Sequence, residues 1–310
     1  MKRLDLKISI IIPCMNEEAN ILPLFKNINK QLKEKYSFTV LFVDDGSNDN
    51  TLSTIKGLAR SNVNVKYISL SRNFGHQMAL KAGYDHVDGD AIISMDGDMQ
   101  HPVEILEEMI KKWEDGYDVV SSRRQDTTSS VFKRKSSTLF YKIYNSFSKI
   151  KLNEGTADFR LIDAKVLNAF REIKESNMFI RGLIAWMGFK QYELFYTVEK
   201  RLYGKSKYSI RKMFSLSLDG FTSFSISPLR ISSLVGITLS MISFIYVIYA
   251  LYMHLFTHDT VPGWTSLMVC FLFVSGLQFI MIGVAGEYIG KVFLEVKNRP
   301  LYIISEDNLS

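Results

Sequence analysis

Two aspartates separated by one glycine, Asp96 and Asp98, directly follow the apolar run of residues 91–95. A short apolar run bounded by a turn is typical of a buried strand, so both carboxylates are expected where a strand ends. Paired carboxylates are hard oxygen ligands that suit Mg²⁺ or Mn²⁺ held against phosphate groups. Acidic turns with glycine are also ordinary surface features, so this pair needs support from other residues.

The first 125 residues alternate short apolar runs with amphipathic segments. The apolar runs predict strands at residues 8–12, 39–43, 65–70, 91–95 and 118–121. Between them, apolar residues recur at the spacing of a helix face, namely at Ile21, Leu24, Phe25, Ile28 and Leu32 and, after Pro102, at Ile105, Met109 and Trp113. Alternating βαβα units predict an α/β fold with a doubly wound, mostly parallel, Rossmann-like sheet. Ligands of such sheets bind at the carboxyl ends of the strands.

Polar residues follow three of the predicted strands at these ends. Asn16 and Glu17 follow the first strand, Asp44 and Asp45 the second, and residues 96–98 the fourth. Each cluster alone could be a helix cap or a turn. Together on one sheet edge, the three clusters indicate a nucleotide site. The first two clusters would hydrogen-bond the base and ribose, and the third would hold a cation for the phosphates. No glycine loop of the dinucleotide or P-loop pattern follows the first strand, so the phosphates are expected to depend on the metal.

Two C-terminal segments, residues 231–253 and 264–286, contain no Asp, Glu, Lys or Arg. As helices, each is long enough to cross about 30 Å of hydrocarbon. Basic residues precede the first segment and follow the second, whereas the connecting residues 254–263 contain no Lys or Arg. This asymmetry predicts a multi-pass protein of the inner or plasma membrane with both termini in the cytoplasm.

The same pattern predicts four regions. They are a catalytic domain at residues 1–208, an amphipathic juxtamembrane segment at 209–230, a transmembrane hairpin at 231–290 and a cytoplasmic tail at 291–310. Simple packing of the amphipathic segment on the catalytic domain is the alternative for 209–230. The net charge of +6 suits anionic lipids or ligands, while no motif supports binding of nucleic acid. The only two cysteines, Cys14 and Cys270, fall in different regions, so no disulfide is expected.

Several longer motifs extend across the whole chain. They are Val43-Asp44-Asp45-Gly46-Ser47, Ser71-Arg72-Asn73-Phe74-Gly75, Met95-Asp96-Gly97-Asp98-Met99-Gln100-His101-Pro102, Asp158-Phe159-Arg160-Leu161 and Arg201-Leu202-Tyr203-Gly204-Lys205-Ser206-Lys207-Tyr208. With the paired apolar segments, they resemble the family 2 glycosyltransferases of GT-A fold. Within that family the sequence is most similar to polyprenyl-phosphate glycosyltransferases of the dolichyl-phosphate mannose synthase type.

The resemblance implies a reaction. A sugar would pass, with inversion, from a nucleotide sugar to the phosphate of a polyprenyl lipid, undecaprenyl or dolichyl, at the cytoplasmic membrane face. The product would supply lipid-linked sugar for modification of cell-envelope glycans. Uridine diphosphate glucose or N-acetylglucosamine is the expected donor, with GDP-mannose as the alternative. A homo-oligomer, such as a tetramer, is also implied.

The resemblance assigns site residues by their place in the motifs. Asp96, Asp98 and Gln100 would hold Mg²⁺ or Mn²⁺, with Asp98 also counted as catalytic. The nucleotide sugar would contact Pro13, Asn16, Glu17, Asp44, Asp45, Arg72 and Asp96. The acceptor phosphate would contact Arg123, Arg124, Lys133, Arg134, Ser137, Arg160, Arg201, Ser206 and Lys207, with Arg124 preferred. For residues 133–135 a solvated charged face is the alternative.

Asp158 stands where the family's catalytic base is usually proposed. A phosphate monoester with a second pKa near ~6 is already largely ionised at neutral pH and hardly needs a base. A carboxylate beside such a dianion would also repel it unless cations intervene. We therefore expect Asp158, counted among the catalytic residues, mainly to orient Arg160 or the sugar hydroxyls.

Other classes fit the sequence less well. A processive polysaccharide synthase would carry a Gln-x-x-Arg-Trp segment and more membrane spans, and this sequence has neither. A non-catalytic membrane scaffold or lipid-translocating subunit stays open as an alternative, although carboxylates at all expected positions argue against it. His76 and His101 are expected in core or turn roles, because no His/Cys constellation accompanies them.

Overall fold

The computed structural model describes residues 3–125, 156–176, 178–197, 227–252, 256 and 263–309. The acceptor candidates Lys133, Arg134, Ser137, Arg201, Ser206 and Lys207 lie outside these ranges, as does most of the predicted juxtamembrane segment. The chain forms two compact units. The first comprises residues 1–146, 150–216 and 299–310, and the second comprises 147–149 and 217–298.

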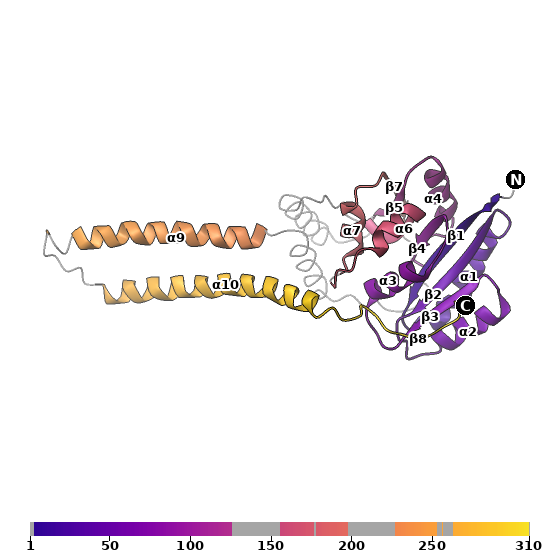
Figure 1. Ribbon diagram of the computed structural model, residues 1–310, viewed down its shortest axis with the longest axis horizontal. Coiled ribbons are helices and arrows are strands. Elements are labelled where there is room, and N and C mark those ends of the chain that lie inside the picture. Colours follow the sequence, from indigo (N-terminus) through magenta and orange to yellow (C-terminus); the bar gives the residue numbers. More distant parts are fainter. Residues whose placement is uncertain are drawn as a thin grey trace. The chain divides into compact units, whose positions relative to one another are not determined.

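The first unit contains a sheet and the helices that cover it (Figure 1). Its strands are β1 (Arg3–Cys14), β2 (Tyr36–Asp44), β3 (Val65–Leu70), β4 (Ala91–Ser94), β5 (Val119–Gln125), β6 (Thr156–Asp163), β7 (Gln191–Thr197) and β8 (Ile304–Asp307). Its helices are α1 (Glu18–Leu32), α2 (Thr51–Ser61), α3 (His76–His86), α4 (Ile105–Glu114), α6 (Ala164–Arg171) and α7 (Ile180–Trp186). The five predicted strands and the two predicted helices are confirmed.

The strands are ordered β7-β5-β6-β4-β1-β2-β3-β8 in one sheet. Neighbours pair in parallel between β4, β1, β2 and β3 and between β5 and β7, whereas β6 and β8 pair antiparallel with their neighbours. The predicted α/β fold with a mostly parallel sheet is confirmed. The sequence did not predict β6, β7 or β8, and the reversed β6 and β8 make the sheet mixed.

Helices on both faces of the sheet explain the unbroken apolar run in β1. Ile10 and Ile12 belong to one buried cluster with the α1 residues Ile21 and Leu24. Ile11 points to the opposite face. There it meets Gly83 of α3 so closely that a Cβ on this glycine would lie 2.3 Å from Ile11 Cγ2. The central strands are therefore covered on both sides, as expected for a doubly wound sheet.

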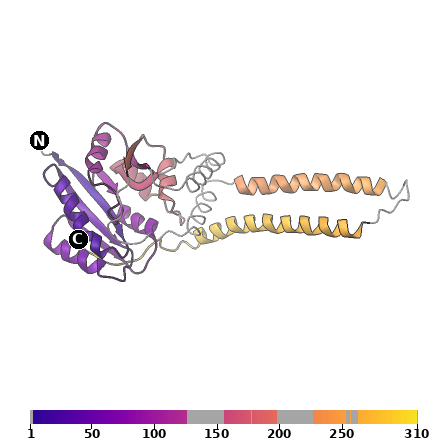
Figure 2. The ribbon, with the colours of Figure 1, turned by 180° about the vertical axis from the view of Figure 1, so that it is seen from behind.

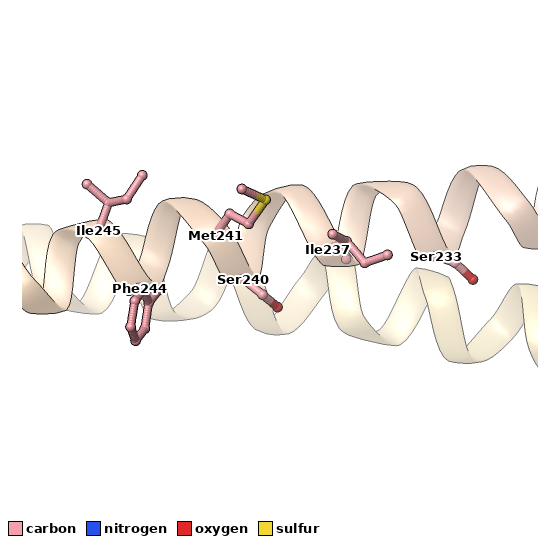
Figure 3. A pocket seen from close by; sticks show the side chains of 7 residues that line it. Ser233, Ile237, Ser240, Met241, Phe244 and Ile245 are labelled. Carbon is pink, nitrogen blue, oxygen red and sulfur yellow. The ribbon is translucent and has the colours of Figure 1, made fainter.

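The second unit contains two long antiparallel helices, α9 (Ser227–Tyr252) and α10 (Trp264–Val296), which lie side by side (Figures 1 and 2). They approach closely at Gly236, where an added Cβ would lie 3.3 Å from Met281 Cε. Exposed apolar side chains of α9 line an open groove, among them Ile237, Met241 and Phe244 (Figure 3).

These helices start and end at different residues from those predicted. Helix α9 begins at Ser227, inside the predicted juxtamembrane segment, and α10 continues to Val296, ten residues beyond 286. Among the described residues, one stretch, Ser227–Tyr246, is long and apolar enough to cross a membrane. The predicted second span lies within α10, and a membrane crossing by both helices stays a prediction.

Candidate active site

The three polar clusters predicted at strand ends meet at one edge of the sheet. Strand β1 lies between β4 and β2, with Cys14 opposite Asp44 and Ile11 opposite Ser94. The turn after β4 packs directly on the end of β1, because a Cβ on Gly97 would lie 3.2 Å from Cys14 Sγ. The parallel topology therefore brings residues from distant parts of the sequence together.

Asn16 and Glu17 connect the end of β1 to the segment after β2. The Asn16 N–H donates to Ser47 Oγ at 2.9 Å, and Asn16 Oδ1 accepts from the Asn48 N–H at 2.8 Å. The Glu17 N–H donates to Thr51 Oγ1 at 2.9 Å. Asn16 has a φ of 54°, a left-handed conformation that asparagine tolerates better than most residues. These bonds fix the wall of the predicted nucleotide pocket.

Asp44 and Asp45 are almost completely buried, with 1% and 3% of their surface exposed. Asp44 accepts from the Ser47 N–H at 3.2 Å and from Ser69 Oγ at 3.0 Å. Asp45 accepts from the N–H groups of Phe74 and Gly75 at 2.7 and 3.0 Å. Burial raises the pKa of Asp45 even though these two N–H groups lower it, and the nearby Asp44 adds to the rise.

Two glycines make this arrangement feasible. Gly46 has a φ of 67°, and a Cβ there would lie 2.5 Å from the carbonyl carbon of Arg72. Gly75, with a φ of 99°, precedes the first residue of α3 and presents its N–H to Asp45. The backbone of residues 71–75 can therefore lie directly against the turn after β2.

Asp96 is held by two histidines. His101 Nε2 lies 3.0 Å from Asp96 Oδ2, and His76 Nε2 lies 3.5 Å from Asp96 Oδ1. His101 is buried, and the Tyr196 hydroxyl lies 2.9 Å from its Nδ1. Burial alone would raise the pKa of Asp96, but the His101 hydrogen bond and the charges of both histidines lower it to about 2. Asp96 is therefore a carboxylate at neutral pH.

Asp98 and Gln100 lie in the same turn and are both half-buried. The Gln100 N–H donates to Asp98 Oδ1 at 3.1 Å. Met99 between them has a φ of 57°, which is unfavourable for a side chain of this kind. The left-handed conformation of Met99 therefore belongs to the tight turn that places Asp98 and Gln100 side by side.

These donors fit a divalent cation bound together with a phosphate ligand. Two carboxylates and one amide oxygen are hard ligands, and Mg²⁺ usually takes one or two carboxylates, substrate phosphates and water. Among the described residues, no three His, Cys, Asp or Glu side chains form a complete metal cage by themselves. The cation at this turn would therefore complete its coordination with the diphosphate.

Asp158 lies on β6 at the centre of a second cluster. Its Oδ1 accepts from Arg160 Nη2 and Arg181 Nε, both at 2.9 Å. Its Oδ2 accepts from Arg181 Nη2 at 2.9 Å and from Gln77 Nε2 at 3.1 Å. Burial alone would raise the pKa of Asp158, but the charges of Arg181 and Arg160 outweigh it and hold this pKa well below its usual range.

His76 joins the two clusters. Its Nε2 lies 3.5 Å from Asp96 Oδ1 and 3.6 Å from Asp158 Oδ2. Burial lowers the pKa of His76, but its contact with Asp158 and the charge of Asp96 outweigh this and raise it. His101 is buried, in line with the core role expected for it, and both His76 and His101 contact carboxylates of the candidate site.

Sequence reasoning missed three residues of these clusters: Gln77, Arg181 and Tyr196. Arg181 had a visible signal, since it is the only charged residue in the apolar run 178–186. A lone charge in an apolar stretch often has a buried partner. Gln77 and Tyr196 carried no comparable signal.

Two acceptor candidates, Arg160 and Arg123, are held by internal partners. Arg160 is 2% exposed and bound to Asp158. Arg123 Nη1 lies 3.2 Å from Glu193 Oε2, and its guanidinium lies over the ring of Phe195. Arg124 belongs to β5. Arg72, a nucleotide-pocket candidate, is exposed and stacks on Phe74 at 4.1 Å from the ring centre.

The sequence matches two family models. Residues 9–171 match Glycosyl transferase family 2, and residues 227–292 match the GtrB C-terminal hairpin. The chain is 42% identical over 302 residues to Uncharacterized glycosyltransferase YkcC of Bacillus subtilis (strain 168), covering 96% of this chain and 93% of that one. It is 40% identical over 305 residues to the Bactoprenol glucosyl transferase of Shigella phage SfII, covering 98% of this chain and 99% of that one.

A solved structure supports the fold. Mannosyl-3-phosphoglycerate synthase from Rubrobacter xylanophilus matches with a TM-score of 0.50 and 16% sequence identity, over 69% of this chain and 71% of that one. The family model covers more than half of the chain, and the relatives cover nearly all of it. The chain therefore belongs to glycosyl transferase family 2, is a glycosyltransferase, and carries the GtrB C-terminal hairpin.

Proposed function

We propose that this enzyme transfers a sugar from a nucleotide sugar to the phosphate of a polyprenyl lipid at the membrane, with inversion at the anomeric carbon. The main support for the proposal is that residues 96–98 lie at the same edge of the sheet as Asp44 and Asp45. The acceptor class is supported by a bactoprenol glucosyl transferase that is 40% identical over nearly the whole chain. We favour uridine diphosphate glucose as donor, with N-acetylglucosamine next.

The residues at the sheet edge have separate roles in this proposal. Asn16, Glu17, Asp44 and Asp45 form the wall for the base and ribose, and Arg72 lies exposed beside them. Asp96, Asp98 and Gln100 hold the cation. When bound, the cation offsets the negative charge that grows on the diphosphate as the glycosidic bond breaks. His101, fixed by Tyr196, keeps Asp96 ionised and in place.

The acceptor phosphate oxygen attacks the anomeric carbon, and the nucleoside diphosphate leaves. We propose that Asp158 does not take a proton in this step. Its two oxygens are already bound by Arg160, Arg181 and Gln77, and its lowered pKa makes it a weak base. Asp158 instead orients the two arginines, whose charge favours an anionic acceptor nearby.

The membrane part of the proposal rests on the second unit. One helical stretch, Ser227–Tyr246, is long and apolar enough to span a membrane, and residues 227–292 match the GtrB hairpin. We propose that both α9 and α10 cross the membrane, with both termini on the cytoplasmic side, where nucleotide sugars are made available. Association of copies into a homo-oligomer is part of the same proposal.

The test uses purified full-length protein with undecaprenyl phosphate and labelled UDP-glucose, UDP-N-acetylglucosamine or GDP-mannose, with Mg²⁺, with Mn²⁺, or with EDTA. We expect a lipid-linked sugar from one donor and loss of the product with EDTA. Asp98→Asn should lower turnover by about 100-fold or more, because the charge that holds the cation is halved. Asp88→Asn, at a side chain that is 94% exposed, is the matched control and should keep full turnover.

Different outcomes reject different parts of the proposal. A lipid-linked product that forms equally well with EDTA would reject the role given to residues 96–100. If no donor gives a product, the acceptor class is wrong, and the non-catalytic scaffold or lipid-translocating alternative gains support. For Asp158→Asn, activity that is lost at low pH and recovers as the lipid phosphate becomes dianionic would support a base role against the one proposed.

A further inference from the structure

Residues 301–308, the C-terminal strap, belong to the same compact unit as the strand-end site. Strand β8 within the strap pairs antiparallel with β3, placing Ser69 opposite Glu306 and Ile68 opposite Asp307 (Figure 1). Asn308 extends this pairing through two hydrogen bonds with the backbone of Tyr67, at 3.2 and 2.6 Å. The sequence suggested only a tail in this region, yet its residues complete one edge of the sheet.

The strap also holds the loop that supports Asp45. The Ser71 N–H donates to the carbonyl oxygen of Ile303 at 2.9 Å. The same loop, residues 71–75, packs its backbone on Gly46 and provides both N–H groups bound by Asp45. On β3 itself, Ser69 donates to Asp44 Oδ2 at 3.0 Å. The backbone that supports both aspartates is therefore bordered by the strap.

A second contact fastens the strap to α3. The Tyr302 hydroxyl donates to Asp85 Oδ2 at 2.9 Å, and Asp85 Oδ1 accepts from the buried Lys81 at 2.6 Å. The ring of Tyr302 lies edge-on to His86, with ring centres 6.0 Å apart. Burial and the negative charge of Asp85 raise the pKa of Tyr302, so its hydroxyl stays a donor at neutral pH.

Helix α3 connects the strap with the Asp96 and Asp158 clusters. Its last turn contains Asp85 and His86, which meet the strap. Its first turn contains His76 and Gln77, which contact Asp96 and Asp158. A helix of eleven residues is a rigid element, so fixing its last turn and the loop before it fixes its first turn.

We propose that the C-terminal strap positions the donor site: by holding residues 71–75 and α3, it sets the placement of Asp45, His76 and Gln77. The strap touches no substrate itself. This role presupposes that Asp44 and Asp45 line the donor site as proposed above. Along the chain, only residues 297–300 separate the strap from the end of α10.

The first test measures hydrogen–deuterium exchange in full-length protein without substrate. Tyr302→Phe removes the hydrogen bond to Asp85, and Asn308→Ala removes the side-chain acceptor for the Tyr67 N–H. We expect exchange of the amides in residues 71–86 to rise by up to about ten-fold, because a hydrogen bond to a charged group is lost in Tyr302→Phe. Tyr192→Phe on β7, at the opposite edge of the sheet, is the matched control and should leave these amides unchanged.

The second test measures kinetics of the same variants. We expect the donor KM to rise by about 3- to 10-fold while kcat stays within about two-fold, because Asp45 loses support from residues 71–75, whereas Asp96 keeps its shorter contact with His101, which the strap does not touch. Tyr302→His lacks the hydroxyl but keeps an N–H that can donate to Asp85, so its donor KM should rise less than that of Tyr302→Phe.

Two results would overturn the proposal. One is unchanged exchange in residues 71–86 in both strap variants while exchange of β8 itself rises. The other is faster exchange in residues 71–86 with donor KM and kcat both equal to those of the unmodified enzyme. If the unmodified enzyme transfers no sugar to lipid, the proposed function fails, and the exchange measurement still decides whether the strap holds the loop and α3.

Discussion

The Asp44–Asp45 pair and Asp158 are both buried carboxylate sites, but their surroundings differ. Asp44 and Asp45 are bound by three backbone N–H groups and one serine hydroxyl. Asp158 is bound by two guanidinium groups and one amide. The pKa of Asp45 is raised by its burial, whereas that of Asp158 is lowered because the charges of Arg181 and Arg160 outweigh its burial.

This difference separates a site held by neutral backbone and hydroxyl donors from a site held mainly by cationic side chains. Neutral donors hold Asp45 in place without balancing its charge. The charges of Arg160 and Arg181 balance that of Asp158. In the proposed mechanism, the anionic acceptor would therefore bind beside Asp158 and not beside Asp45.

The largest effect on stability is expected at Asp158. Asp158→Ala leaves Arg160, which is 2% exposed, without the carboxylate that balances it. Removal of one partner of a buried ion pair destabilises a protein by about 3–5 kcal/mol. Thermal or denaturant unfolding of the purified variant in detergent measures this loss. Asp88→Ala, at a highly exposed carboxylate, is the control and should change stability by less than ~0.5 kcal/mol.

A small loss of stability in Asp158→Ala would contradict the view that Asp158 is held by buried ion pairs. If the variant lost no more than ~1 kcal/mol, the arginines would gain little from the carboxylate. Asp158 would then resemble a surface ion pair, and its role in orienting Arg160 and Arg181 would be excluded.

The residues at the strand ends could be predicted from sequence. Apolar runs and helix periodicity located β1 to β5, α1 and α4, and the topology of parallel sheets then brought Asn16, Asp44 and Asp96 to one edge. The strand and helix predictions depend on residues close together in the chain, and the general rule that ligands of parallel sheets bind at the carboxyl ends of the strands supplies the rest. The family motifs independently indicate the same residues as candidates for the site.

The partners of Asp158 and the two reversed strands could not be predicted. Gln77 and Arg181 reach Asp158 from 81 and 23 residues away, and β8 joins β3 from the far end of the chain. Strand β6 separates β4 from β5 and runs against both, which no local pattern signals. Pairings between distant segments are set by tertiary packing, so periodicity and motif spacing carry no information about them.

Gly46→Ala should disturb the Asp44–Asp45 site without replacing either carboxylate. The new Cβ would lie 2.5 Å from the Arg72 carbonyl carbon, at a φ of 67°. Overpacking and the unfavourable conformation together predict a loss of about 2–3 kcal/mol and a higher donor KM. Gly57→Ala in α2 is the matched control, since a Cβ there meets nothing within 4 Å and should stabilise the helix by up to ~1 kcal/mol. Equal stability of the two variants would show that the loop of residues 71–75 moves freely.

Asp45→Asn should have a smaller effect. The amide oxygen can still accept one of the two N–H groups from residues 74 and 75, while the other donor is left facing an NH₂ group. The loss of one neutral-donor hydrogen bond predicts a decrease of about 1 kcal/mol in the free energy of unfolding. A loss as large as that of Asp158→Ala would mean that charge, and not local hydrogen bonding, holds this cluster together.

The smallest effect concerns pH, and it has opposite signs at the two sites. Because the folded-state pKa of Asp45 lies above 3.8, folding favours its protonated form, and its contribution to stability falls as pH rises from 3.8 through that pKa. Because the pKa of Asp158 lies well below 3.8, its contribution is complete above 3.8 and is lost as pH falls below it.

Unfolding of the two asparagine variants across the acid range tests this sign difference. The stability lost in Asp45→Asn, relative to the unmodified protein, should grow as pH falls from neutral toward 3.8, because the unmodified protein gains stability there. The stability lost in Asp158→Asn should stay constant down to 3.8 and shrink below it, as protonation removes the ion pairs from the unmodified protein as well. If both differences changed in the same direction, one type of interaction would hold both clusters, and the distinction between neutral and cationic partners would not explain their behaviour.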